Sequence, residues 1–247
     1  MTSQEAMIFQ LKKLKGRPFR DIMIHIFTYF WVPIVIVAAV LGLLVSVIVT
    51  RVTQKAPALT VCCINAVAQH EDTATYGEQF AEKAGIDLSE YEITILTNLN
   101  ANDSDALTAY QSTQILMAMV AAESLDVIAA DQETALQCMY ADYCADLSRL
   151  LSDTQMAQYQ QYFLYMDLDY LSQIQNADTL DGQPLTYPDP TKPEEMVQPI
   201  PMAMQLPEDS EFVKMFFPHS REDMVLCVAA NSQNLHNALK FLEYACS

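Results

Sequence analysis

One long apolar stretch dominates the hydrophobic pattern of the chain. Residues 22–50 contain no Asp, Glu, Lys or Arg, and within residues 30–49 only Pro33 and Ser46 interrupt the apolar side chains. A helix needs about 20 apolar residues to cross the hydrocarbon layer of a bilayer. Because every backbone polar group must be satisfied inside lipid, a lone span has to be helical. The pattern therefore predicts a single N-terminal transmembrane helix.

After this stretch, short apolar runs alternate with longer amphipathic ones. Runs rich in β-branched residues predict strands, and runs with a helical period that begin at a capping residue predict helices. The expected strands are 59–66, 91–97 and 126–130, and the expected helices are 76–84, 105–123, 131–140 and 154–165. The helix over 105–123 is apolar nearly all round, so we expect it to be substantially buried. Strand–helix alternation of this kind predicts an α/β domain with a mostly parallel sheet.

The pattern changes in the segment 167–221. Eight of the eleven prolines fall between Pro184 and Pro218, which excludes a long helix there but allows short extended pieces. Regular structure returns with a strand over 224–230, after which Asn231 or Ser232 is expected to cap a last helix. The sequence leaves open whether the Pro-rich insert forms a second lobe.

Charge divides the chain into three parts. The tail, residues 1–21, holds five basic residues against two acidic ones, which favours a cytoplasmic N-terminus. We therefore expect a cytoplasmic basic tail over 1–21, a transmembrane signal anchor over 22–50 in the cell membrane, and an extracytoplasmic domain over 56–247. A cleaved signal peptide is the alternative, but its apolar region is about 7–15 residues long, much shorter than this stretch.

The segment 56–247 is strongly acidic. It contains 29 Asp and Glu residues against six Lys and Arg residues, a net charge of −23. A charge of this sign repels phosphate backbones, so nucleic acid is excluded as a partner.

Few residues suggest chemistry. No two of the four histidines share metal-ligand spacing, and the five glycines form no phosphate-binding loop. We therefore expect no catalytic residues, no metal, no cofactor and no enzyme activity. An outer compartment permits disulfides, and Cys138 and Cys144, which flank a helix end, are the best candidate pair.

Three phrases in the sequence resemble a known family. They are Leu125-Asp-Val-Ile-Ala-Ala130, Ala145-Asp-Leu-Ser-Arg-Leu-Leu151 and the segment 228–244. Together with the long helix before the first phrase, they look like one lobe of an extracellular solute-binding protein of ABC importers, with the type 2 periplasmic-binding fold. The resemblance covers about residues 58–165 and 222–245. It implies one lobe of that α/β fold, truncated and attached to the membrane.

That resemblance also implies where a ligand would bind. Ligands of open α/β sheets meet the loops at the carboxyl ends of the strands. The expected ligand-binding residues are Gln69, His70, Asn98, Asn100, Asp103, Ser104, Asp131 and Asn231. The alternative for Asp103, Ser104, Asp131 and Asn231 is that each only caps a helix.

The sequence thus predicts a single-pass, membrane-anchored, non-catalytic binding domain. Its expected partners are the lipid bilayer through residues 22–50, a small solute, and a membrane permease or another envelope protein. The alternative is an envelope assembly or protein-docking module in which the lobe has lost ligand binding, since a full second lobe is missing from the sequence.

Overall fold

The computed structural model describes residues 31–53, 55–68, 70–101, 106–176, 186–219 and 223–246. The chain forms two compact units, Met1–Gln54 and Lys55–Ser247. In the first unit, α3 (Trp31–Thr53) is a helix of 23 residues. Among the described residues, no helix combines the length and the apolar character that a membrane crossing requires. Several side chains of α3 lie outside the described residues.

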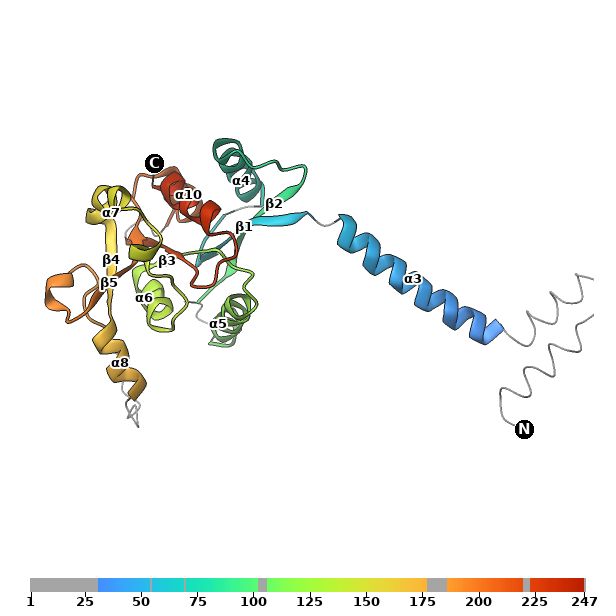
Figure 1. Cartoon of the computed structure of the whole chain (residues 1–247), viewed down its shortest axis with the longest axis horizontal. Coiled ribbons are helices and arrows are strands. Elements are labelled where there is room, and N and C mark those ends of the chain that lie inside the picture. The colour runs from blue at the N-terminus through green and yellow to red at the C-terminus, as the bar shows by residue number, and fades with distance from the viewer. Residues whose placement is uncertain are drawn as a thin grey trace, which may run out of the picture. The chain divides into compact units, whose positions relative to one another are not determined.

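The second unit is an α/β domain (Figure 1). Its strands are β1 (Ala56–Ile64), β2 (Tyr91–Leu99), β3 (Val127–Asp131), β4 (Phe163–Asp167), β5 (Pro199–Gln205) and β6 (Met224–Val228). Its α-helices are α4 (His70–Ala84), α5 (Ala106–Ala121), α6 (Gln132–Tyr140), α7 (Asp153–Tyr159), α8 (Leu168–Asn176), α9 (Glu211–Phe216) and α10 (Leu235–Ala245). Short 3-10 turns lie at Leu147–Arg149, Gln160–Tyr162 and Pro193–Glu195.

The described strands form one mixed sheet in the order β2-β1-β3-β6-β5-β4. β1 is parallel to both β2 and β3, whereas the pairings β3–β6, β6–β5 and β5–β4 are antiparallel. The expectation of an α/β fold is confirmed, but the expectation of a mostly parallel sheet is wrong. The period of apolar residues identifies a strand, but the direction of its partner depends on where the connecting chain re-enters the sheet.

The predicted helix over 154–165 is partly wrong. α7 ends at Tyr159, and Phe163 begins β4, which pairs with β5 more than 30 residues later. Phe163 and Leu164 are both buried but belong to different hydrophobic clusters. A strand with apolar side chains on both faces cannot be distinguished from a buried helix by its periodicity.

The Pro-rich insert, where the structure describes it, belongs to the same compact unit as the rest of the domain. β5 carries prolines at 199 and 201 and still joins the sheet, between β4 and β6. α9 places Phe212, Val213 and Phe216 in the hydrophobic core. The described part of the insert therefore shares the sheet and the hydrophobic core of the α/β domain.

Helices cover both faces of the sheet. α4 and α10 lie on one face, and α5 and α6 lie on the other (Figure 1). Alternate residues of each central strand serve the two faces: Val61 and Val127 belong to the core under α4 and α10, whereas Cys62 and Ile128 belong to the core under α5 and α6. Full burial of both faces explains why β1, β3 and β6 are continuous apolar runs.

Hydrogen bonds to Asp126 connect the segment before α10 to the central strand β1. The buried Asp126 carboxylate accepts hydrogen bonds from the Thr60 backbone N–H (2.8 Å), the Ser232 hydroxyl (2.6 Å) and the Asn234 side-chain amide (3.1 Å). The Ser232 hydroxyl therefore donates its hydrogen bond to Asp126. The helix α10 begins at Leu235, after Asn234, and the Asn234 side chain makes no hydrogen bond that caps the helix. The prediction that Asn231 or Ser232 caps this helix is wrong.

Candidate ligand site

The carboxyl ends of β1, β2 and β3 are joined through one side chain, Asn65. Its amide nitrogen donates a 3.0 Å hydrogen bond to the Asp131 carboxylate, and its amide oxygen accepts a 2.8 Å hydrogen bond from the Ala101 N–H. Its own N–H donates to the Leu99 carbonyl at 2.8 Å. Asn65 has φ of 61°, a left-handed conformation that Asn tolerates better than most residues. The three strand ends are thus held in a fixed arrangement.

A cavity of about 130 Å³ opens beside this junction, between α5 and α6. Its wall combines the strand ends with the facing sides of the two helices. The lining residues are Ile64, Leu99, Ala101, Ser112, Thr113, Leu116, Thr134, Gln137, Cys138, Ala141 and Tyr143. Ligands of α/β proteins commonly bind at this edge of the sheet. We therefore take this cavity as the candidate ligand site.

Hydrogen bonds fix two hydroxyl groups in the wall of the cavity. The Ser112 hydroxyl accepts a 3.0 Å bond from the Asn100 N–H, and the Thr134 hydroxyl donates a 3.0 Å bond to Asp131. Asp131 also caps α6 by accepting from the Thr134 N–H at 2.9 Å. These bonds hold α5 and α6 against the strand ends, so the cavity has a preformed shape.

The lining is uncharged. Its members are aliphatic, hydroxyl, amide, thiol and phenol side chains, with no Lys, Arg, Asp, Glu or His among them. Burial raises the pKa of the Cys138 thiol far above its ordinary value, so that group stays protonated. A charged ligand would lose its hydration here without gaining an opposite charge. The site suits a neutral solute that offers hydroxyl or amide groups.

The structure brings some of the predicted ligand residues to this edge. Asp131 lies at the junction, and Asn100 contributes its N–H to the wall. Asn98 is exposed on β2, at the edge of the sheet. His70 begins α4, but its side chain lies outside the described residues, as do Gln69, Asp103 and Ser104.

Asn231 is not at this edge. β6 is antiparallel to β3, with Asp131 opposite Met224 and Val127 opposite Val228, so the residues after Val228 lie at the amino end of β3. There the Asn231 side-chain amide donates to the Val120 carbonyl. The expectation that Asn231 converges with Asp131 is wrong, because it assumed that the returning strand is parallel.

Sequence reasoning missed Asn65, Ser112, Thr134 and Gln137. A signal existed for Asn65: it follows an apolar, β-branched run and is one of the few residues that tolerate a left-handed turn. Ser112 lies on α5, and Thr134 and Gln137 lie three residues apart on α6. Nothing in their spacing shows that the two helices face each other across a cavity.

The cysteines of the domain are thiols in this structure. Cys138 and Cys144 are both buried and are not bonded to each other. Cys144 has a hydrogen bond with the Cys227 thiol, which together with burial raises the pKa of Cys144. The disulfide between Cys138 and Cys144 stays a prediction. In the part of the chain that the structure describes, no three His, Cys, Asp or Glu side chains are placed to hold a metal ion together.

Comparison with known proteins found no matching family, no matching curated protein and no matching solved structure.

Proposed function

We propose that this protein is a membrane-anchored, non-catalytic binding domain that holds a small uncharged solute between α5 and α6. The observation that carries the proposal is the preformed, uncharged cavity at the carboxyl ends of β1 and β2. An engineered cavity of about 150 Å³ in another protein accommodates benzene. By that comparison, a cavity of about 130 Å³ suits a ligand of about six non-hydrogen atoms.

The resemblance to one lobe of a solute-binding protein supports the same proposal. β6 follows the Pro-rich insert and lies beside β3, so the two stretches of chain that carry the resemblance belong to one sheet. The described part of the insert adds β5 to that sheet, which leaves a single lobe to bind the solute. In this proposal the solute binds in a cavity within one lobe, and not in a cleft between two lobes.

Attachment to the membrane rests on residues 22–50. α3 carries described side chains that are apolar and exposed, including Val35, Ile36, Leu41 and Leu43. A helix that is apolar all round needs an apolar environment such as lipid. The basic tail supports a cytoplasmic N-terminus and therefore an extracytoplasmic position for Lys55–Ser247. Extraction of cell membranes with alkaline carbonate tests the anchor: recovery of the full chain in the soluble fraction would contradict it.

Solute binding is tested by thermal unfolding of the full chain in detergent with small probes such as glycerol, propylene glycol and acetamide. A ligand at a hundred times its dissociation constant stabilises the folded state by about 2.7 kcal/mol. Ala141 lines the cavity, so A141F should fill it and abolish the shift. Ala74 is exposed on α4, so A74F is the matched control and should keep the shift. An equal shift in both variants would show a general solvent effect and contradict the proposal.

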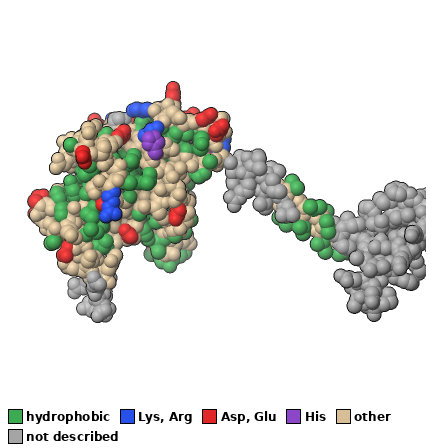
Figure 2. Space-filling view, in the orientation of Figure 1, with side chains coloured by type: hydrophobic (Ala, Val, Ile, Leu, Met, Phe, Trp, Pro, Cys, Tyr) green, Lys and Arg blue, Asp and Glu red, His purple; other side chains and the backbone are tan. Residues whose placement is uncertain are grey.

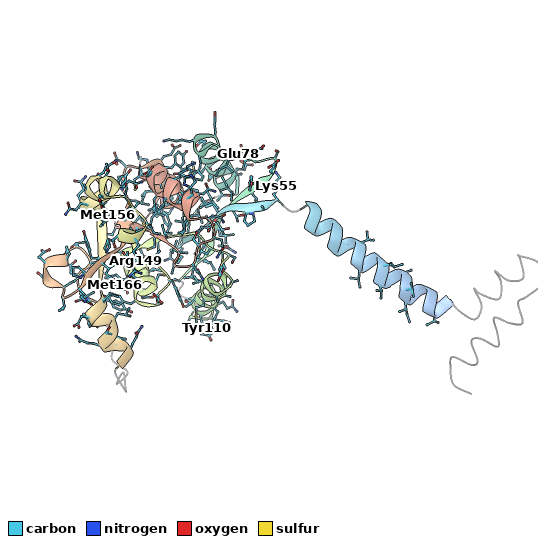
Figure 3. All side chains as sticks on the ribbon, viewed as in Figure 1. Lys55, Glu78, Tyr110, Arg149, Met156 and Met166 are labelled. Carbon is cyan, nitrogen blue, oxygen red and sulfur yellow. The ribbon has the colours of Figure 1, made fainter. Side chains whose placement is uncertain are left out.

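A second function, assembly through a protein surface, is favoured by α5. This helix has no charged residue, and only Ser112, Leu116 and Val120 of it are buried. The expectation that it is substantially buried is wrong, because most of its side chains are exposed or half-buried among the described residues. Leu107, Tyr110, Ile115 and Met117 are each more than 40% exposed. Figure 2 shows hydrophobic side chains where Figure 1 places α5, and Figure 3 labels Tyr110 there.

The partner proposed for this face is a second copy of the chain. Two domains of charge −23 repel each other, and an uncharged helix lets them meet with the least repulsion. Sedimentation of the full chain in density-matched detergent tests this. The I115E substitution should convert a dimer to a monomer, whereas V197E, at an exposed position in the insert, should leave the dimer intact. A monomeric unsubstituted chain would contradict self-association.

A further inference from the structure

A second cavity lies on the opposite face of the domain, between the last turn of α4 and α10. Its volume is about 320 Å³, larger than the cavity between α5 and α6. It is lined by Phe80, Lys83, Ala84, Lys240, Glu243 and Tyr244. The helices α4 and α10 that form it lie side by side on one face of the sheet (Figure 1).

The charges in this cavity are unusual for the domain. Lys83 and Lys240 are two of only six basic residues in the segment 56–247, and both line the same cavity. Among the described residues, the ion pairs involve Arg149 and Lys192, and neither Lys83 nor Lys240 pairs with a carboxylate within 4.0 Å. Two ammonium groups without a carboxylate partner are thus gathered in a domain that is otherwise acidic.

Each ammonium group is positioned by a neighbour. Lys240 Nζ donates a 2.9 Å hydrogen bond to the Ala84 carbonyl, near the end of α4. Lys83 Nζ lies 4.9 Å from the centroid of the Tyr244 ring, a cation–π contact. An ammonium group has three N–H donors, so both can still donate to a ligand.

Glu243, the one carboxylate in the lining, is held by another residue. Its Oε1 accepts a 2.8 Å hydrogen bond from the Gln155 side-chain amide on α7. Gln155 is itself fixed, because it forms a capping box with Ser152 at the start of α7. This bond directs Glu243 toward α7 and leaves the two ammonium groups to a ligand.

Aromatic rings form the apolar part of the cavity. The rings of Phe80 and Tyr244 lie 5.5 Å apart at an interplanar angle of 43°. Phe80 is buried against Phe241, so its ring cannot move away from the cavity. A ligand with a planar apolar body can pack against the partly exposed ring of Tyr244, which the buried Phe80 ring supports. Aromatic contacts of this kind favour offset or edge-to-face geometries.

We propose that this cavity binds a small aromatic monocarboxylate, with its carboxylate between Lys83 and Lys240 and its ring against Tyr244. A single negative charge fits better than a dianion such as a phosphate ester, since the net charge of the domain and Glu243 both repel added negative charge. The site is independent of the uncharged cavity between α5 and α6, and each site has its own ligand class and its own variants.

Saturation-transfer NMR and equilibrium dialysis on the full chain in detergent test this with sodium phenylacetate. The neutral analogue 2-phenylethanol and the dianion phenyl phosphate serve as comparison probes. Phenylacetate should bind about ten-fold more tightly than 2-phenylethanol, and its binding should weaken in 0.5 M NaCl. Equal binding of the alcohol would show a purely apolar site, and tighter binding of phenyl phosphate would show an anion site of another class. Either result overturns the proposal.

Two variants locate the site. K83Q and K240Q should each weaken phenylacetate binding about ten-fold, since each removes one charge-assisted hydrogen bond. K214Q, at an exposed position on α9, should bind as the unsubstituted chain does. K240Q also loses the bond to Ala84, so its folding is checked by circular dichroism, whereas Lys83 is exposed and K83Q keeps the fold. Unchanged binding in K83Q contradicts the proposal.

Discussion

The side-chain amide of Asn65 donates a 3.0 Å hydrogen bond to the carboxylate of Asp131, 66 residues later in the chain. This bond joins the carboxyl end of β1 to that of β3, and Asp131 at the same time caps α6. The candidate ligand site is therefore built on a contact between two strand ends, and the helices on either side take their positions from it.

Two substitutions of Asn65 separate the contribution of its side-chain hydrogen bonds from that of its left-handed backbone. N65G keeps the left-handed backbone but loses the side chain, and should cost about 1–3 kcal/mol of unfolding free energy from the lost hydrogen bonds. N65A adds a strained left-handed alanine and should cost about 1 kcal/mol more. Urea unfolding of both variants measures the difference. An alanine variant as stable as the glycine variant would show that the backbone at residue 65 can relax.

Asp126 and Ser232 provide a second test. S232A removes a 2.6 Å hydrogen bond to a buried carboxylate and should cost about 1.5–3 kcal/mol. Q111A, at an exposed position on α5, is a control that should change the unfolding free energy by less than about 0.5 kcal/mol. Hydrogen exchange at the Asn234 N–H should also accelerate in S232A, because that N–H donates to both Asp126 and Ser232. Unchanged exchange at the Asn234 N–H would contradict a stabilising role for the hydrogen bonds among Asp126, Ser232 and Asn234.

Asp167 links β4 to the insert and predicts a pH dependence. Burial tends to raise the pKa of Asp167, but hydrogen bonds from backbone N–H groups, including those of Val197 and Gln198 at 3.0 Å, outweigh burial and lower it. A carboxyl whose pKa is lower when folded stabilises the fold fully above its unfolded pKa of about 3.9. That stability is lost as the pH falls through the folded value.

The D167N substitution should therefore cost about 2 kcal/mol at pH 7, since an amide offers one oxygen where the carboxylate offers two. The difference from the unsubstituted chain should shrink as the pH falls below about 3.9, because Asp167 takes up a proton in the unfolded chain at a higher pH than in the folded chain. Denaturant unfolding at pH 7, 5 and 3 measures it. If the difference in unfolding free energy between D167N and the unsubstituted chain stays constant down to pH 3, the charge of Asp167 plays no part in stability.

Phe241 lies at the centre of an aromatic cluster. Its ring lies 5.1 Å from Phe80, 5.7 Å from Phe212 and 6.1 Å from Tyr76, measured between centroids. F241A should cost about 3–5 kcal/mol through lost burial and the cavity left behind. L235A, at a partly exposed position on the same helix, should cost less than about 1 kcal/mol. Similar costs for the two variants would contradict the burial of this helix face.

The cysteines make a prediction about reactivity. Burial raises the pKa of Cys62 to about 12 and that of Cys246 to about 12, so neither forms a reactive thiolate near pH 8. We expect a thiol reagent to label these cysteines in the folded chain far more slowly than in guanidinium chloride. Mass spectrometry of the unreduced protein decides the predicted Cys138–Cys144 bridge, because alkylation of both residues would exclude it.

The helix–strand assignments show where sequence reasoning succeeds. Tyr91–Leu99 and Met224–Val228 are strands close to the expected bounds, and Asp131 caps a helix that ends at Tyr140 as expected. These features depend on neighbouring residues only. The predicted helix over 154–165 wrongly includes the first three residues of β4, because the partner of this strand, β5, lies far away in the sequence. The exposed face of α5 was missed for a similar reason, since an apolar helix does not reveal whether another element covers it.

By itself, the sequence determined the apolar stretch over 22–50, the acidity of the segment 56–247 and the α/β character of the domain, because these depend on composition and on local periods of 2 and 3.6 residues. Only the tertiary structure decided the antiparallel direction of β6 and the position of Asn231 away from the carboxyl ends of β1, β2 and β3. It also decided that Lys83 and Lys240 line the same cavity. These features depend on pairings between segments far apart in the chain. Such pairings are set by the packing of the whole domain, and no local pattern records them.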